Sequence, residues 1–187
     1  MAGEIPSGRY EIRLSGLGGQ GLILAGRLLA EAAALYDGKY ATQTQVYGPE
    51  SRGGDSRSDV VISDEPIDFP HVIQADLLLA MSQMACDRNF YSLKRDGLLI
   101  VDADLVQHVP TNRAYLVPIT RMARQELGRE VVANVVALGI VVALSNVVSR
   151  KAVAAAVAAG VPRGTEALNR KALELGFRLG DELKAAR

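Results

Sequence analysis

The sequence predicts an α/β fold, a three-layer sandwich in which a mostly parallel sheet lies between helices. Strand-like and helix-like patterns alternate through the first two thirds of the 187 residues. A glycine-rich turn joins the first strand to the first helix, which is a Rossmann-like start. The last third shows helical periodicity only. We therefore expect one domain over 1–187, with a sheet core at about 10–118 and a helical end at about 119–187.

The spacing of apolar residues, and the residues that end helices and strands, predict the first elements. Residues 10–15 alternate at period two and predict a strand. Apolar residues recur at helical spacing over 20–36, and Asp37 with Gly38 should end that helix. The threonine-rich segment 39–45 predicts a second strand, and 47–57 is rich enough in glycine, proline and serine to be a loop.

The remaining elements are short apolar runs followed by longer helical patterns. Further strands are expected at 59–63, 76–82, 98–102 and 114–117. Further helices are expected at 83–94, 121–127, 131–148, 151–159 and 166–185. The range 131–148 has no charge over 18 residues, but it carries Asn134, Ser145 and Asn146, which are costly in hydrocarbon. We interpret it as a buried helix and expect no membrane association.

Composition excludes several classes of protein. The 49% apolar content excludes disorder, and 21 basic against 21 acidic side chains argue against a nucleic-acid partner. A single cysteine, Cys86, excludes an internal disulfide, a cysteine-based zinc site and a four-cysteine cluster. The first nine residues hold no apolar run of signal-peptide length. We expect a cytoplasmic location.

The glycine turn is the first candidate site. Its residues are Gly16, Gly18, Gly19, Gln20 and Gly21, in the pattern G-x-G-x-x-G between a predicted strand and a predicted helix. Glycines let the backbone approach a phosphate, whose charge is attracted by the free N–H groups and dipole of the helix start. The alternative is a turn that needs glycine only for tight strand–helix packing.

A nicotinamide cofactor would require one more feature, an acidic residue at the end of the second strand that binds the ribose. Positions 42–45 read Thr-Gln-Thr-Gln, and Asp37 comes before the strand. A nicotinamide site is therefore weakly supported.

The loop at 47–57 is the second candidate site. The residues of this loop that could bind an anion are Tyr47, Ser51, Arg52, Gly53, Gly54 and Arg57. Arginine and hydroxyl side chains could hold a carboxylate or phosphate. The alternative is a solvated loop in which Glu50 and Asp55 pair with the two arginines. The carboxylate of Asp55 should weaken anion binding by this loop unless Arg52 or Arg57 neutralises it.

Other polar residues give no catalytic residue and no metal site. His71 and His108 have no partner at metal-ligand spacing, and Asp102 and Asp104 are more typical of a turn cap than of a metal site. Cys86 could have a lowered pKa early in a helix, but a packed thiol is the more common case.

Taken together, the motifs resemble a known family. The segments 16–27, 47–54 and 56–63 closely resemble the gamma subunit of 2-oxoacid:ferredoxin oxidoreductases, most of all the 2-oxoglutarate type. Further segments that support the resemblance are 80–83, 97–102, 134–139 and 164–172. The likeness runs from about residue 10 to 180.

The resemblance implies a role inside a complex. Such complexes convert a 2-oxoacid, coenzyme A (CoA) and oxidised ferredoxin to an acyl-CoA, CO₂ and reduced ferredoxin. Thiamine diphosphate and iron–sulfur clusters are expected in companion subunits, so this chain would bind no cofactor alone. CoA would be a shared substrate, received in part by the two candidate loops. The chain would be inactive by itself and could form a homodimer in isolation.

Three alternatives remain open. A subunit of this type could act on pyruvate, branched-chain 2-oxoacids or indolepyruvate. A free-standing nicotinamide or flavin oxidoreductase would use the glycine turn for a dinucleotide. A pure scaffold subunit would use the glycine turn for protein contacts only and the apolar range 131–148 as a docking face.

Overall fold

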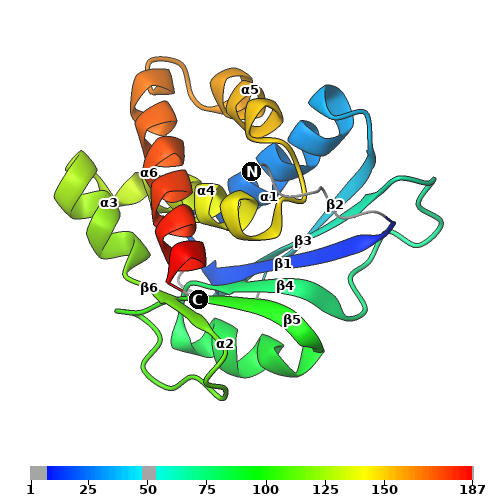
Figure 1. Cartoon of the computed structure of the whole chain (residues 1–187), viewed down its shortest axis with the longest axis horizontal. Coiled ribbons are helices and arrows are strands. Elements are labelled where there is room, and N and C mark those ends of the chain that lie inside the picture. The colour runs from blue at the N-terminus through cyan, green and yellow to red at the C-terminus, as the bar shows by residue number, and fades with distance from the viewer. Residues whose placement is uncertain (1–7, 48–53, 187) are drawn as a thin grey trace.

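The computed structural model describes residues 8–47 and 54–186. Its centre is a six-stranded sheet with the order β2-β3-β1-β4-β5-β6 (Figure 1). The strands are β1 (Tyr10–Leu17), β2 (Tyr40–Tyr47), β3 (Asp55–Ser63), β4 (Ala75–Ala80), β5 (Leu93–Asp102) and β6 (Tyr115–Val117). The helices are α1 (Leu22–Glu31), α2 (Gln83–Asn89), α3 (Ile119–Leu127), α4 (Ala133–Ser145), α5 (Arg150–Gly160) and α6 (Glu166–Ala185).

The sheet is mostly parallel, as predicted. β1, β4, β5 and β6 run in one direction, whereas β3 lies antiparallel to β1 and β2 lies antiparallel to β3. The Rossmann-like start therefore ends after α1. The second strand lies at the edge of the sheet instead of beside β1, so the position that holds the ribose-binding acid in dinucleotide enzymes does not border the glycine turn.

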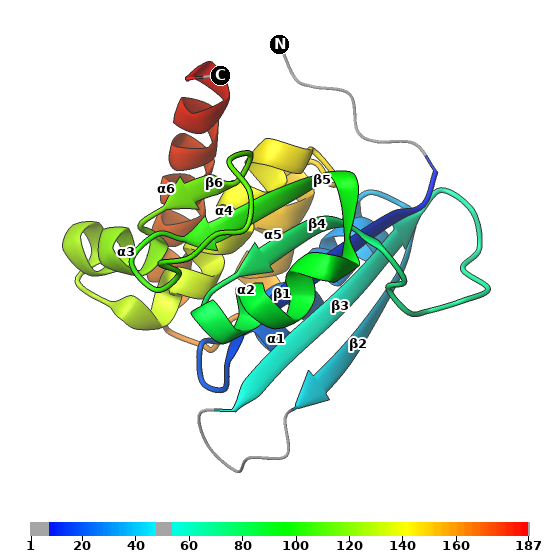
Figure 2. The ribbon, with the colours of Figure 1, turned by 90° about the horizontal axis from the view of Figure 1, so that it is seen from below.

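Helices cover both faces of the sheet, which confirms the predicted three-layer arrangement (Figures 1 and 2). The apolar side chains Ile12 and Leu14 of β1 pack in a cluster with residues of α1, α4 and α5 on one face. On the other face Leu78 and Leu99 pack with Cys86 of α2. Side chains alternate between the two faces of a strand, so each strand contributes to both layers.

Helix α4 is the central element of the helical layer, and all of its residues are buried. It lies between the sheet and α6 (Figure 1). The expectation that 131–148 supplies an apolar docking face is therefore wrong over this helix, because the chain itself covers it; only Val131, just before the helix, is strongly exposed. No helix within the described ranges has both the length and the apolar character to span a membrane.

Several boundaries differ from the sequence prediction, most clearly at the loop before β3 and at the start of β5. The loop expected at 47–57 is shorter, because Tyr47 ends β2 and residues 55–57 begin β3. The strand expected at 98–102 begins at Leu93, and the turn expected at Asp96 and Gly97 is an irregularity in the pairing of β5 with β4. Polar residues hid both extensions: β5 has exposed charged residues near its start, whereas the start of β3 buries Ser56 and Ser58 where an apolar run would be expected.

Candidate functional site

The two candidate loops meet at the carboxyl end of β1. The backbone N–H of Gly18 donates to the carbonyl oxygen of Gly54 at 2.9 Å. Leu17 also pairs with Asp55 at the start of β3. The structure thus brings the glycine turn and the end of the second loop together, at the edge of the sheet where α/β proteins bind ligands.

Three positions of the turn require glycine, for different structural reasons. A Cβ on Gly16 would lie 2.2 Å from Oε1 of Gln20, and one on Gly21 would lie 2.5 Å from Nδ2 of Asn134. Gly19 has a φ of +97° and nothing within 4 Å of where its Cβ would be. Packing therefore explains Gly16, Gly21 needs glycine both for packing and for its φ of +76°, and Gly19 needs glycine for its backbone conformation and borders open space.

Gln20 fixes the turn to the neighbouring strand. Its Oε1 accepts from the N–H of Leu17 at 2.7 Å, and its Nε2 donates to the carbonyl oxygen of Met81 at 2.9 Å. Both ends of this side-chain amide are used inside the protein. In this structure Gln20 acts as a structural brace that holds the turn against the end of β4.

The start of α1 is the part of the turn that suits an anion. Gly21 is the N-cap and has no side chain to offer, and the first turn of the helix contains no acidic residue. The first N–H groups of a helix have no partner within the helix itself. Since the described residues provide no capping side chain for α1, these donors and the positive end of the helix dipole remain available to a ligand.

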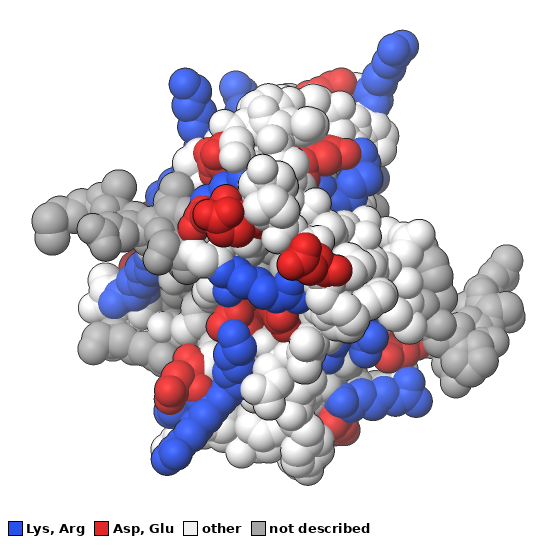
Figure 3. Space-filling model, turned by 90° about the vertical axis from the view of Figure 1, so that its right-hand side faces the viewer, with Lys and Arg blue, Asp and Glu red and all other residues white. Residues whose placement is uncertain are grey.

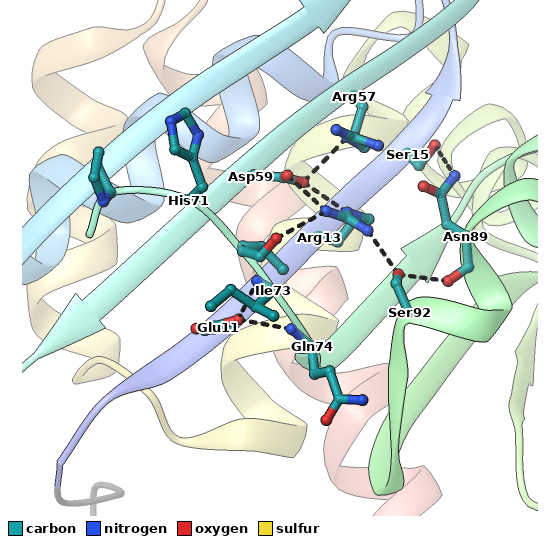
Figure 4. Close-up of polar contacts among 12 residues, drawn as sticks. Glu11, Arg13, Ser15, Arg57, Asp59, His71, Ile73, Gln74, Asn89 and Ser92 are labelled. Atoms are coloured by element: carbon teal, nitrogen blue, oxygen red, sulfur yellow. Dashed lines mark hydrogen bonds and ion pairs between the residues drawn. The ribbon is translucent and has the colours of Figure 1, made fainter.

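A buried ionic cluster lies on the α2 side of β1 and β3 (Figure 4). Arg13 donates from Nε and Nη2 to the two carboxylate oxygens of Asp59, both at 2.8 Å. Its remaining contacts are the hydroxyl of Ser92 at 2.6 Å and the carbonyl oxygen of Val72 at 3.4 Å. Nε of Arg57 lies 3.4 Å from the same carboxylate. The carboxylate of Asp59 therefore forms ion pairs with two guanidinium groups.

Asp55 is neutralised by a residue that sequence reasoning did not name. Its carboxylate accepts from the hydroxyl of Ser15 at 3.3 Å and lies 3.6 Å from Nη1 of Arg88 on α2. Arg57, which we expected as one possible partner, is paired with the carboxylate of the ionic cluster instead. Side chains alternate along β3, but they also lean toward neighbouring elements, and the α2 arginine is the one within reach.

Some predicted site residues lie outside the described ranges, namely Ser51, Arg52 and Gly53, together with Glu50. Tyr47 is the last residue of β2. The residues that the sequence analysis missed are Arg13, Asp59, Arg88 and Asn134. A signal existed for Arg13, because it alternates with the apolar Ile12 and Leu14 in the first strand and so lies on the opposite face.

Cys86 is a packed thiol rather than a reactive one. It is fully buried in the cluster beneath the sheet, and burial, aided by the nearby Asp87, raises the pKa of the thiol. We expect a thiol reagent to modify the native chain at least about a hundredfold more slowly than the chain in denaturant, since only opening of the fold exposes the sulfur. Equal rates in the two conditions, measured by mass spectrometry, would contradict this placement.

The structure gives the other polar candidates no catalytic or metal-binding arrangement among the described residues. Asp102 is buried, and its oxygens accept from the N–H of Asp104 and from the N–H and hydroxyl of Thr120, which confirms the turn-capping interpretation. His71 and His108 are exposed. Within residues 8–47 and 54–186, no group of three acidic, histidine or cysteine side chains is placed to hold a metal ion. Charges of both signs are interspersed on the face shown in Figure 3.

The comparisons with known proteins agree with this fold. Residues 11–179 match the pyruvate ferredoxin/flavodoxin oxidoreductase family. The chain is 50% identical over 179 residues to the 2-oxoglutarate synthase subunit KorC of Methanocaldococcus jannaschii, covering 94% of this chain and 96% of that relative. It is 32% identical over 142 residues to the pyruvate synthase subunit PorC of Methanothermobacter marburgensis, covering 74% of this chain and 79% of that one.

A solved structure gives the same result. The keto/oxoacid ferredoxin oxidoreductase gamma subunit from Geobacter sulfurreducens PCA superposes with a TM-score of 0.87 at 51% identity, covering 95% of this chain and 99% of that one. The match therefore extends over nearly the whole of both chains. This chain belongs to the pyruvate ferredoxin/flavodoxin oxidoreductase family.

Proposed function

We propose that this chain is the gamma-type subunit of a multi-subunit 2-oxoglutarate:ferredoxin oxidoreductase of the cytoplasm, inactive alone, with residues 1–187 as one domain. The observation that carries the proposal is 50% identity, over nearly the whole of both chains, to a subunit named for 2-oxoglutarate synthase. The subunit named for pyruvate synthase is 32% identical over a shorter range. This difference favours 2-oxoglutarate over pyruvate as the 2-oxoacid.

In the proposed reaction the bond between the carboxylate and the 2-oxo carbon breaks, CO₂ leaves, and a thioester forms with CoA. The two electrons released pass to ferredoxin. Thiamine diphosphate would supply the decarboxylation chemistry, and iron–sulfur clusters the electron path, both from companion subunits. With one cysteine, this chain cannot hold a four-cysteine cluster by itself.

The contribution of this chain would be one wall of the CoA cleft. Three observations support a place for CoA phosphates at the glycine turn: the start of α1, which no described side chain caps, the open space beside Gly19, and the absence of acids in the first turn of α1. Arg57, the strand-pairing partner of Ser15, is held by Asp59, and Asp55 is neutralised by Arg88. The turn thus offers donors to an anion with no unpaired carboxylate among these residues.

The substrate assignment is tested with the complex assembled from this chain and its companion subunits. The assay supplies CoA and oxidised ferredoxin with 2-oxoglutarate, pyruvate, a branched-chain 2-oxoacid or indolepyruvate. We expect the highest kcat/KM with 2-oxoglutarate. A higher value with another 2-oxoacid would reassign the subtype, and recovery of the chain as a lone NAD-binding protein would refute the proposal.

The CoA contact is tested by a charge at the start of α1. Ile23 is the second residue of that helix, is half-buried and lies outside the apolar core clusters. We expect I23E to raise the KM for CoA about tenfold relative to the isosteric, neutral I23Q, because a carboxylate there repels phosphates. The same charge stabilises a helix start, so I23E should melt no lower than I23Q. Equal KM values would remove the phosphate role of the turn.

A further inference from the structure

Strand β2 is an edge strand, and its outer side meets no strand of the described residues. It pairs with β3, and no other strand in the described part of the chain lies against it. Figure 2 shows it at the outer margin of the sheet. No residue in the range 40–46 is fully buried, whereas most of the neighbouring β3 is.

This edge lacks the features that natural sheets use to prevent pairing with another chain. The sequence of β2 is Tyr-Ala-Thr-Gln-Thr-Gln-Val-Tyr, eight residues without a charge, a proline or a glycine. Its pairing with β3 is continuous and shows no bulge. The opposite edge, β6, is only three residues long. A long edge strand without charges, proline or a bulge is a template for pairing with another strand, which favours a strand of another chain along β2.

The two faces of β2 are fixed by its contacts. Gln43 donates to the hydroxyl of Ser58 and to the carbonyl oxygen of Ile23, so the odd-numbered residues face α1. Thr42 donates to the carbonyl oxygen of Pro70, in the loop on the other face. Tyr40 and Val46 have the same parity as Thr42 and therefore share its face.

A second copy of β2 fits this edge in one register. In an antiparallel pair, residues directly opposite each other lie on the same face. A twofold axis through Gln43 places Tyr40 opposite Val46 and Thr42 opposite Thr44 of the other copy. Tyr40 and Val46 are 50% and 45% exposed in the single chain, so this register covers two exposed apolar side chains with each other. Aromatic with β-branched and Thr with Thr are favourable cross-strand pairs.

We propose that two copies of this chain associate through antiparallel pairing of their β2 strands about a twofold axis at Gln43, joining their sheets into one. No like charges meet along the seam, because β2 has no charged residue. The backbone groups of the free edge gain partners. The proposal uses neither the glycine turn nor any substrate and stands independently of the proposed function.

The first test measures the mass of the full-length chain by light scattering over a range of concentrations. We expect a dimer. T44K places two lysines at diagonal positions across the axis, about 7–8 Å apart from strand to strand, and the repulsion between their charges should raise the dimer dissociation constant at least about tenfold. The matched control is L116K on the other edge strand, where Leu116 is 56% exposed; it should leave the dimer unchanged. A monomeric wild-type chain, or T44K as dimeric as L116K, would overturn the proposal.

The second test determines the register in which the two β2 strands pair. In Y40C/V46C the two new thiols face each other across the seam, so oxidation should link the copies covalently. In Y40C/T44C they are offset, and linkage should be several-fold slower. The native Cys86 is buried and does not compete. Equal linkage would refute the register, and β2 amides that gain hydrogen-exchange protection only on addition of companion subunits would assign the edge to a partner subunit instead.

Discussion

Replacing Asp59 with Ala should lower the free energy of unfolding by about 3–5 kcal/mol, because it leaves a buried guanidinium without its counter-charge. Arg13 is 6% exposed and donates two of its hydrogen bonds to this carboxylate, each at 2.8 Å. After the change it would keep only Ser92 and the carbonyl oxygen of Val72 as partners. Neither carries a charge.

The measurement is urea unfolding at one fixed protein concentration, which keeps any association constant between variants. Asp96 is the matched control: its side chain is 95% exposed and lies 3.9 Å from Arg113, so D96A should cost less than about 1 kcal/mol. The double variant R13L/D59L should recover most of the loss, because it removes both buried charges together. A loss in D59A as small as in D96A would contradict the burial of this pair.

D59A should also affect the proposed CoA site. The same carboxylate holds Arg57, which pairs across the sheet with Ser15, the residue before the glycine turn. In the assembled enzyme we therefore expect the KM for CoA to rise even where the variant remains folded.

The element order could be predicted from local patterns, but the position of β2 could not. Local patterns predict buried strands at 10–15, 76–82 and 98–102, by alternation in the first range and by apolar runs in the other two. These strands lie in the parallel half of the sheet. The segment 39–45 is polar, so its pattern does not show which strand it neighbours. Only the length of the connection gives the answer: the seven residues between β2 and β3 are too few for a crossover to a parallel strand, so the two strands are expected to be antiparallel.

The glycines of the candidate site could be predicted from the sequence, but the polar residues that support the site could not. Gly16 to Gly21 carry a motif that is local in sequence. Asp59, by contrast, serves Arg13, and the two are 46 positions apart, so their contact depends on β1 and β3 being neighbours. Helix α4 illustrates a related limit: when every residue is apolar, periodicity cannot show whether a partner or the chain itself covers the helix.

Gly176→Ala should destabilise the fold by about 3 kcal/mol or more, although alanine is the better helix former by about 1 kcal/mol. Gly176 lies where α6 crosses α4. A Cβ there would lie 2.2 Å from the carbonyl oxygen of Val136 and 2.8 Å from Cα of Gly139. Both neighbours are backbone atoms of α4, so the only relief is for the two helices to move apart.

The separation of these helices would open the main core, because α4 is buried on every side between the sheet and α6. Gly160→Ala at the end of α5 is the matched control: its nearest neighbour is Cδ2 of Leu28 at 2.5 Å, the far end of a flexible side chain. We expect its cost, measured by urea unfolding, to be less than half that of Gly176→Ala. A Gly176→Ala variant more stable than wild type would mean that helix propensity outweighs packing at this crossing, and that α4 and α6 do not touch backbone to backbone.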